Sequence, residues 1–260
     1  MERRTFDNGV TLVGSFEGSV SFGFTERTGG VSLEPYAALN LGSHVGDDPA
    51  AVAENRRRAL AALGCAGYGE RLIVPNQVHG DHVAVVRASD PATLDAVRAE
   101  VAAGADAIVC VAPHVPVMLC FADCVPVVLT APDGFAVVHS GWKGTYARIA
   151  GKAARGLIEA TGCAPRAVRA YIGPHILGDE YEVSLELIAR FEERFRDAHP
   201  SGPRLLDLSA CIGQALAEAG VPAGNITDPG LSTMRRNDRF YSYRVENGVC
   251  GRHAAVAVLR

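Results

Sequence analysis

Three short polar stretches stand at the ends of apolar runs, where a rigid scaffold could hold chemically active side chains. They are NQVHG at 76–80, FADC at 121–124 and HSG at 139–141. Open-sheet folds place their ligands at strand ends and in the loops beyond them. One residue from each stretch, His79, Cys124 and His139, gives the donor set of a catalytic zinc site, in which three protein ligands leave one position open for water.

The same residues allow an interpretation without metal. A thiol beside an imidazole, with a carboxylate such as Asp123 to orient the base, would make Cys124 a nucleophile. A straight strand would place Cys120 and Cys124 on one face and Asp123 on the other. The intervals between the residues match no local metal motif, so both interpretations stay open.

The stretch HSGWKGT (139–145) lies between an apolar run and a segment with helical periodicity. It is not a P-loop, because His139 stands where the second glycine of that motif belongs. A Rossmann fingerprint after a strand and a G-x-S-x-G elbow are absent from the sequence. The H-x-E with P-C-x-x-C of zinc deaminases is absent as well.

Capping signals and apolar periodicity predict four helices. They cover 50–63 after Asp47 or Asp48 and Pro49, 146–160 after Thr145, 185–198 after Ser184, and 210–219 after Asp207 or Ser209. The loop at 25–49 is rich in Gly and polar residues but contains apolar ones, which favours an ordered loop packed on the body.

Short apolar runs predict the strands. They lie at 71–74, 82–87, 106–111, 117–121, 125–130, 135–140, 167–173, 240–245 and 253–260. Most are continuously apolar, which is typical of strands buried on both faces. The order does not repeat as βαβ, so we expect an α+β fold, with helices around a large mixed β-sheet or sandwich and one domain over 1–260.

Composition excludes several classes of protein. The 260 residues carry a net charge of -4, with 48% hydrophobic and 21% charged residues, so nothing favours nucleic acid or an anionic membrane as a partner. No signal peptide or membrane span is recognisable, and we expect a cytoplasmic location. The seven cysteines are an odd number without a framework spacing, which favours reduced thiols.

Several motifs in order along the chain resemble one family. They are NLGSHVGDDPAAVAENRRRAL, NQVHG, ADCVPVV, HSGWKGT, IGP, and FYSYR followed by GR. They are similar to the YfiH-like proteins, also called multicopper polyphenol oxidases, purine nucleoside phosphorylases and peptidoglycan editing factors. The resemblance implies a single α+β domain of the YfiH or cytotoxic-necrotizing-factor type. One departure is DPGLSTMRR at 228–236, where many members carry a Cys-Thr pair.

The resemblance also implies a site and an activity. The metal ligands of the family fall on His79, Cys124 and His139, which would bind one zinc ion and form the catalytic centre. The implied reactions are phosphorolysis of adenosine, inosine, guanosine and S-methyl-5'-thioadenosine, and deamination of adenosine to inosine. Purine nucleosides and phosphate would be the partners of a monomeric enzyme.

Copper is the alternative metal. A complete laccase set needs about ten histidines, largely in H-x-H pairs, and this chain has eight histidines and no H-x-H. A copper-dependent polyphenol oxidase would therefore need a different copper arrangement. A third hypothesis is a quality-control protein acting on cell-wall precursors.

Four further residues are candidates for binding substrate. Backbone N–H groups at 141–145 could hold phosphate, with Lys143 or Arg56 supplying positive charge. Asn40 and His44 in the long loop could close over the substrate, and an equally good interpretation is that they hydrogen-bond the loop to itself.

Overall fold

The chain folds around two β-sheets. The computed structural model describes residues 1–196, 198–199 and 201–260. The first sheet is antiparallel, with the order β1-β2-β3-β11-β6. Its strands are β1 (Glu2–Thr5), β2 (Thr11–Ser15), β3 (Val20–Thr25), β6 (Val117–Phe121) and β11 (His253–Leu259).

The second sheet is mixed, with the order β10-β9-β7-β8-β5-β4. Its strands are β4 (Val83–Val86), β5 (Ala107–Cys110), β7 (Val125–Ala131), β8 (Gly134–Ser140), β9 (Arg169–Ile172) and β10 (Ile226–Thr227). The pairs β4/β5 and β9/β10 are parallel and the others antiparallel.

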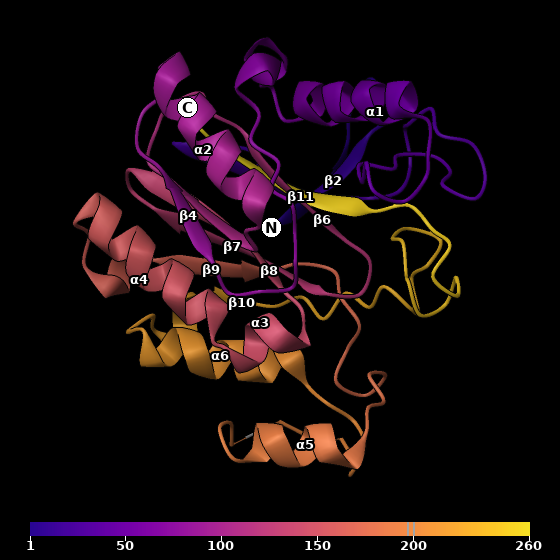
Figure 1. The fold of residues 1–260 in the computed structure, drawn as a ribbon, viewed down its shortest axis with the longest axis vertical. Coiled ribbons are helices and arrows are strands. Elements are labelled where there is room, and N and C mark those ends of the chain that lie inside the picture. The colour runs from indigo at the N-terminus through magenta and orange to yellow at the C-terminus, as the bar shows by residue number, and fades with distance from the viewer. Residues whose placement is uncertain (197, 200) are drawn as a thin grey trace.

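Helices cover the outer faces of this sandwich, with one exception. The helices are α1 (Pro49–Ala62), α2 (Pro91–Ala103), α3 (Trp142–Tyr146), α4 (Ile149–Thr161), α5 (Leu185–Glu192) and α6 (Leu208–Glu218), with the 3-10 turns η1 (Ala66–Arg71), η2 (Pro165–Ala167) and η3 (Ala223–Asn225). The exception is α2, which packs beside the edge strand β4 and buries Leu94, Val97 and Val101 in the core between the sheets. Figure 1 shows α1 at the upper right of the view, α4 at the left with α6 below it, and α5 at the bottom. The α+β class, with two sheets flanked by helices, is confirmed.

The central strands are buried on both faces, which explains their continuous apolar sequences. In β7, Val128 faces the core between the sheets, whereas Val127 and Leu129 face the core under α4 and α6. In β11, Ala255 faces the inter-sheet core and Val256 the core under α1. Alternate residues of one strand thus enter different apolar layers.

The predicted elements need several corrections. Residues 240–245 form an irregular segment that ends in a turn rather than a strand, and 71–74 contributes only an isolated bridge at Ile73. The predicted helix 146–160 is two helices, because Arg148 takes a left-handed conformation with φ 62°. The predicted helix 185–198 is α5, which ends at Glu192, and position 197 of that prediction lies outside the described residues.

The loop at 25–49 is ordered and packed on the body, as predicted. Leu39 and Leu41 are fully buried beneath α1. The Asn55 amide of α1 donates to the backbone carbonyls of Ala38 and Asn40. Within the described residues, no helix is long and apolar enough to cross a membrane.

Candidate metal centre

Three segments bring His79, Cys124 and His139 together. His139 is on β8, Cys124 is in the turn where the chain passes from β6 in the first sheet to β7 in the second, and His79 is in the loop before β4. Their ligand atoms all lie within 4.8 Å of one another. The two imidazole rings are 4.8 Å apart and nearly perpendicular. These residues could hold a metal ion.

The backbone around the three residues has an unusual local form. His79 and Asp123, the residue before Cys124, both take left-handed conformations, with φ 57° and 80°. A Cβ at Gly141 would lie 3.1 Å from the Cys124 sulfur and 3.1 Å from Cδ2 of His79. The absence of a side chain at Gly141 therefore lets the two candidate ligands approach the end of β8.

A buried carboxylate connects two of the segments. Asp106 precedes β5, and the antiparallel register of β5 and β8 places it beside His139. Its Oδ1 lies 2.7 Å from Nδ1 of His139, which leaves Nε2 as the ring atom for a metal. The carboxylate also accepts hydrogen bonds from the backbone N–H groups of Val78, His79 and Gly80. One side chain thus orients the His139 ring and the loop of His79.

Asp106 was missed at the sequence level. The available signal was a polar residue at the start of the apolar run at 106–111, which pairs with the run that ends in His139. Sequence alone does not give that pairing, because several apolar runs could lie beside 135–140.

The three candidate ligands form a coupled charge system. Burial acts to raise the pKa of the Cys124 thiol, but the His139 and His79 rings outweigh it and lower this pKa to about 6. Burial acts to lower the pKa of His139, but Cys124 and Asp106 outweigh it and raise this pKa to about 9. At neutral pH the metal-free pair is therefore a thiolate and an imidazolium.

Asp123 does not orient this pair. Its Oδ1 accepts a hydrogen bond from the Thr233 hydroxyl at 2.6 Å, and its Oδ2 accepts one from the Arg244 backbone N–H at 2.7 Å. The prediction that Cys120 and Cys124 share one face of a strand, with Asp123 on the other, required a straight strand through 124. That strand, β6, ends at Phe121, and Cys124 lies in the turn after it. Asp106 holds the histidine instead.

The candidate metal centre opens into a pocket of about 870 Å³. His44 and Arg56, both predicted to bind substrate, line it together with the three candidate ligands. Other polar or aromatic lining residues were missed; they include Gln77, Tyr181, Tyr243, Arg244 and Arg252. The signal for the last three was their place in FYSYR and GR, two of the motifs that carry the family resemblance.

The other predicted substrate residues lie elsewhere. Asn40 is fully buried, and its amide bonds the backbone of Gly42 and Arg252, which agrees with the interpretation that it holds the loop together. Lys143 is exposed, with its ammonium 5.6 Å from the Trp142 ring. Neither is among the residues that line the pocket.

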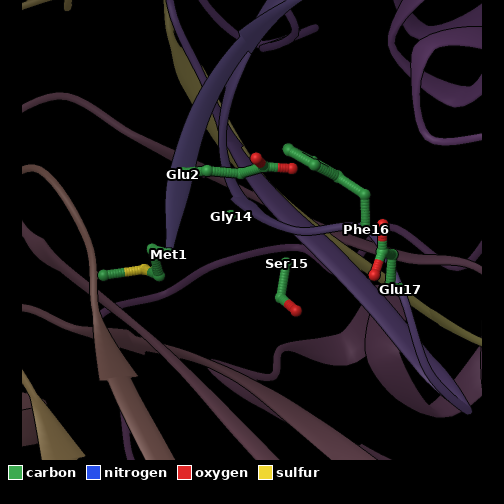
Figure 2. Close-up of a pocket in the computed structure, with 6 residues that line it drawn as sticks. All are labelled: Met1, Glu2, Gly14, Ser15, Phe16 and Glu17. Atoms are coloured by element: carbon green, nitrogen blue, oxygen red, sulfur yellow. The ribbon is translucent and has the colours of Figure 1, made fainter.

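A second hollow of about 360 Å³ lies beside β1 and β2. Figure 2 shows its lining residues: Met1, Glu2, Gly14, Ser15, Phe16 and Glu17. The titratable side chains among the described residues that line it are two carboxylates, and none of these residues has an imidazole or a thiol. The three candidate ligands therefore line the larger pocket and not this hollow.

A family model described as multi-copper polyphenol oxidoreductase laccase matches residues 21–260. The chain belongs to this family. The resemblance seen in the motifs is thereby confirmed. A relative in Deinococcus radiodurans, named purine nucleoside phosphorylase, is 36% identical over 253 residues, covering 95% of this chain and 92% of the relative. Another in Streptomyces griseus, named purine nucleoside phosphorylase ORF3, is 41% identical over 234 residues, covering 87% and 89%.

Two solved structures, named YfiH and YlmD, share the fold of this chain. The hypothetical protein YfiH of Bacillus licheniformis superimposes with a TM-score of 0.86 at 29% identity, and 99% of each chain is covered. YlmD from Geobacillus stearothermophilus also gives 0.86, at 30% identity, covering 99% of this chain and 98% of that one.

Proposed function

We propose that this protein is a zinc-dependent purine nucleoside phosphorylase that acts on adenosine, inosine, guanosine and S-methyl-5'-thioadenosine. The observation that carries the proposal is the convergence of His79, Cys124 and His139 at one end of a pocket large enough for a nucleoside. The names of the relatives from Deinococcus radiodurans and Streptomyces griseus support the substrate class.

The donor set suits zinc. Zinc binds thiolate and imidazole at about 2.0–2.3 Å, so tetrahedral ligand atoms lie under about 4 Å apart. The three ligand atoms here lie within 4.8 Å of one another, so small side-chain movements would bring them to the spacing that one zinc ion requires. His79 is exposed and all three candidate ligands line the pocket, so a fourth position left open on the metal would be reached from the pocket. A bound zinc ion would supply a Lewis acid at that position.

In phosphorolysis, a phosphate oxygen forms a bond to the anomeric carbon of the ribose and the bond from that carbon to the purine nitrogen breaks. The electron pair leaves with the purine, which takes up the proton that hydrogen phosphate gives up. The residues of the chain must hold an anion beside the sugar and compensate its charge. Arg56, Arg244 and Arg252 line the pocket and supply that charge.

Tyr181 is a candidate hydrogen-bond donor to the nucleoside. Its phenol is half-buried in the pocket wall, and the Arg244 guanidinium lies 5.5 Å from its ring. Burial raises the pKa of Tyr181, and the nearby Cys124 thiolate raises it further. The hydroxyl therefore stays protonated at neutral pH, and the ring offers a flat surface for a base.

We also propose hydrolytic deamination of adenosine to inosine at the same centre. Zinc is the metal that other nucleobase deaminases use, and the position open to the pocket would be shared by both reactions. The two activities differ in their need for phosphate.

A copper-dependent phenol oxidase is the second candidate, because the family description names copper and phenols. Two imidazoles and a thiolate also suit copper. Within the part of the chain that the structure describes, however, only one group of three ligands is found, so a cluster of several copper ions is not assembled. The cell-wall quality-control hypothesis stays a prediction from the family resemblance.

One preparation tests these functions. The protein, with its metal content measured by elemental analysis, is incubated with each of the four nucleosides, with and without phosphate. Free purine and a ribose 1-phosphate formed only with phosphate support the phosphorylase, and inosine formed from adenosine without phosphate supports the deaminase. No turnover by fully zinc-loaded protein would refute both. Oxidation of a phenol that requires copper and survives zinc loading would favour the oxidase.

A further inference from the structure

Three cationic or imidazole side chains gather where the pocket meets the loop at 25–49. They are His44, Arg56 and Arg252, here called the cationic corner. Arg56 extends from α1, His44 lies in the loop, and Arg252 directly precedes β11. A Cβ at Gly42 would lie 2.7 Å from Cγ of Arg252 and 3.4 Å from Cε1 of His44, so the glycine allows these two side chains to pack together.

The backbone already fixes both guanidinium groups. Arg56 donates from Nε and Nη2 to the Leu41 carbonyl, at 3.0 and 2.9 Å. Arg252 donates from Nη1 to the carbonyls of Cys250 and Gly251, at 2.8 and 2.9 Å. Nη1 of Arg56 and both Nε and Nη2 of Arg252 then keep donors for another acceptor. Groups held in this way lose little freedom when an anion binds.

No carboxylate among the described residues pairs with these two arginines. Neither Arg56 nor Arg252 forms an ion pair with any residue that the structure describes. Asp123 is the one carboxylate among the described lining residues, and both its oxygens accept hydrogen bonds from other parts of the chain. Half-buried arginines without a carboxylate raise the affinity of a pocket for an anion.

The corner borders the candidate metal centre. Burial lowers the pKa of His44, and the neighbouring side chains of Arg252, Arg56, His79 and His139 lower it further. The His44 ring therefore lies within electrostatic reach of both the arginines and the candidate ligands. It is neutral at pH 7 and can donate one hydrogen bond.

We propose that the cationic corner is the subsite for inorganic phosphate, which would be held by Arg56 and Arg252 with His44 beside them. The inference rests on the proposed phosphorylase function and adds the position of the second substrate. It replaces the phosphate site expected at 141–145. There α3 has only five residues, and Lys143 lies outside the pocket.

The test separates phosphate from nucleoside. Arg252→Met and Arg56→Met keep an unbranched stem and remove the guanidinium. Each should raise the KM for phosphate about 10- to 100-fold, as expected for the loss of hydrogen bonds from a charged donor. The KM for inosine should change far less. Arg56→Lys and Arg252→Lys keep the positive charge but lose the planar guanidinium, and they should give a phosphate KM between those of the wild type and the methionine variants. This intermediate result would show that the methionine variants do not fail merely because they misfold.

Arg57→Met is the matched control. Arg57 neighbours Arg56 on α1, but it is exposed and paired with Glu54. Its removal changes the net charge by the same amount and should leave the phosphate KM nearly unchanged, because solvent and salt screen an exposed charge.

Binding of phosphate alone, measured by titration calorimetry without nucleoside, separates this inference from the proposed function. If the wild-type protein binds phosphate and the Arg252→Met and Arg56→Met variants do not, the subsite stands even when no nucleoside is cleaved. If the wild type performs phosphorolysis and both methionine variants keep its phosphate KM and affinity, the subsite is wrong and the function stands. Equal loss of phosphate affinity in Arg57→Met would also overturn it, because the effect would then come from net charge.

Discussion

At the scale of single residues, Cys124 is the side chain on which the metal assignment can be tested most directly. Its thiolate lies between two imidazoles, and a serine hydroxyl is a far poorer zinc ligand. Cys124→Ser should lose most of the bound zinc and of the activity, as measured by elemental analysis and nucleoside turnover. Cys163→Ser, at a half-buried thiol outside the pocket, should keep both. Unchanged zinc content in Cys124→Ser would refute the assignment.

Asp106 is the residue expected to position the ligands without contacting the metal. An asparagine would present an N–H₂ group to donors that now meet carboxylate oxygen. The His139 ring and the loop of His79 would therefore lose part of the hydrogen bonding that holds them in place. We expect Asp106→Asn to weaken zinc affinity about 10- to 100-fold. Competition with a chromogenic chelator measures that affinity directly.

The control for Asp106 is Asp133→Asn, at an exposed carboxylate in the β7–β8 turn. A purely structural role for Asp106 would lower the melting temperature and leave the zinc affinity of the folded protein unchanged. That outcome would contradict the positioning role.

At the scale of elements, the helices could be predicted because their ends carry local chemical signals. The Asp48 side chain caps α1 before Pro49, Ser184 caps α5 and Asp207 caps α6. The helix α2 has the same signals, since Asp90 accepts from Thr93 N–H and Pro91 follows. It was nevertheless missed, because its buried stripe is only Leu94, Val97 and Val101.

The strands β1, β2 and β3 were missed for another reason. Gly14 in β2 and Gly23 in β3 interrupt the apolar pattern by which strands are recognised, and β1, with the sequence ERRT, is exposed and has no apolar residue. A Cβ on Gly14 would lie 2.7 Å from Cα of Gly23, so the two strands approach more closely than side chains would allow. Conversely, the aromatic run at 240–245 favours a strand, but Phe240 and Tyr241 are buried by tertiary packing in an irregular segment.

The junction of β8 with α3 depends on the small size of Gly141. Its backbone, at φ -73° and ψ 175°, is one that alanine adopts easily, so Gly141→Ala should fold. The new methyl group would press on Cys124 and His79 and should weaken zinc binding several-fold, as measured by chelator competition. Gly156→Ala, whose Cβ would make an ordinary contact with Val109, is the control and should bind zinc as the wild type does. Equal affinity in both variants would show that the site tolerates this methyl group.

At the scale of the whole molecule, the position of the site follows from the arrangement of the two sheets. Cys124 lies where the chain leaves the first sheet for the second, and the hydrogen bonds of Asp106 bring the loop of His79 to the end of β8. Sequence indicated the chemistry of the three residues but not their convergence, because no spacing records which strands pair. The family resemblance supplied that missing step.

The burial of His253 predicts how the stability of the molecule depends on pH. This side chain is fully buried beside Phe121 and Phe240. Burial lowers its pKa from 6.5 to about 3. Below pH 6.5 the unfolded chain therefore takes up a proton that the folded chain does not, and the free energy of unfolding falls as the pH falls towards 3.

His253→Leu removes this titration and fills the site with apolar atoms. In metal-stripped protein its free energy of unfolding should fall less steeply than that of the wild type below pH 6.5, by up to about 1.4 kcal/mol per pH unit. Denaturant unfolding at several pH values measures both slopes. Phe240→Leu, which alters the packing beside the same ring, should lower stability by a similar amount at each pH and keep the wild-type slope. Parallel curves for His253→Leu and the wild type would mean that this histidine does not contribute to acid unfolding.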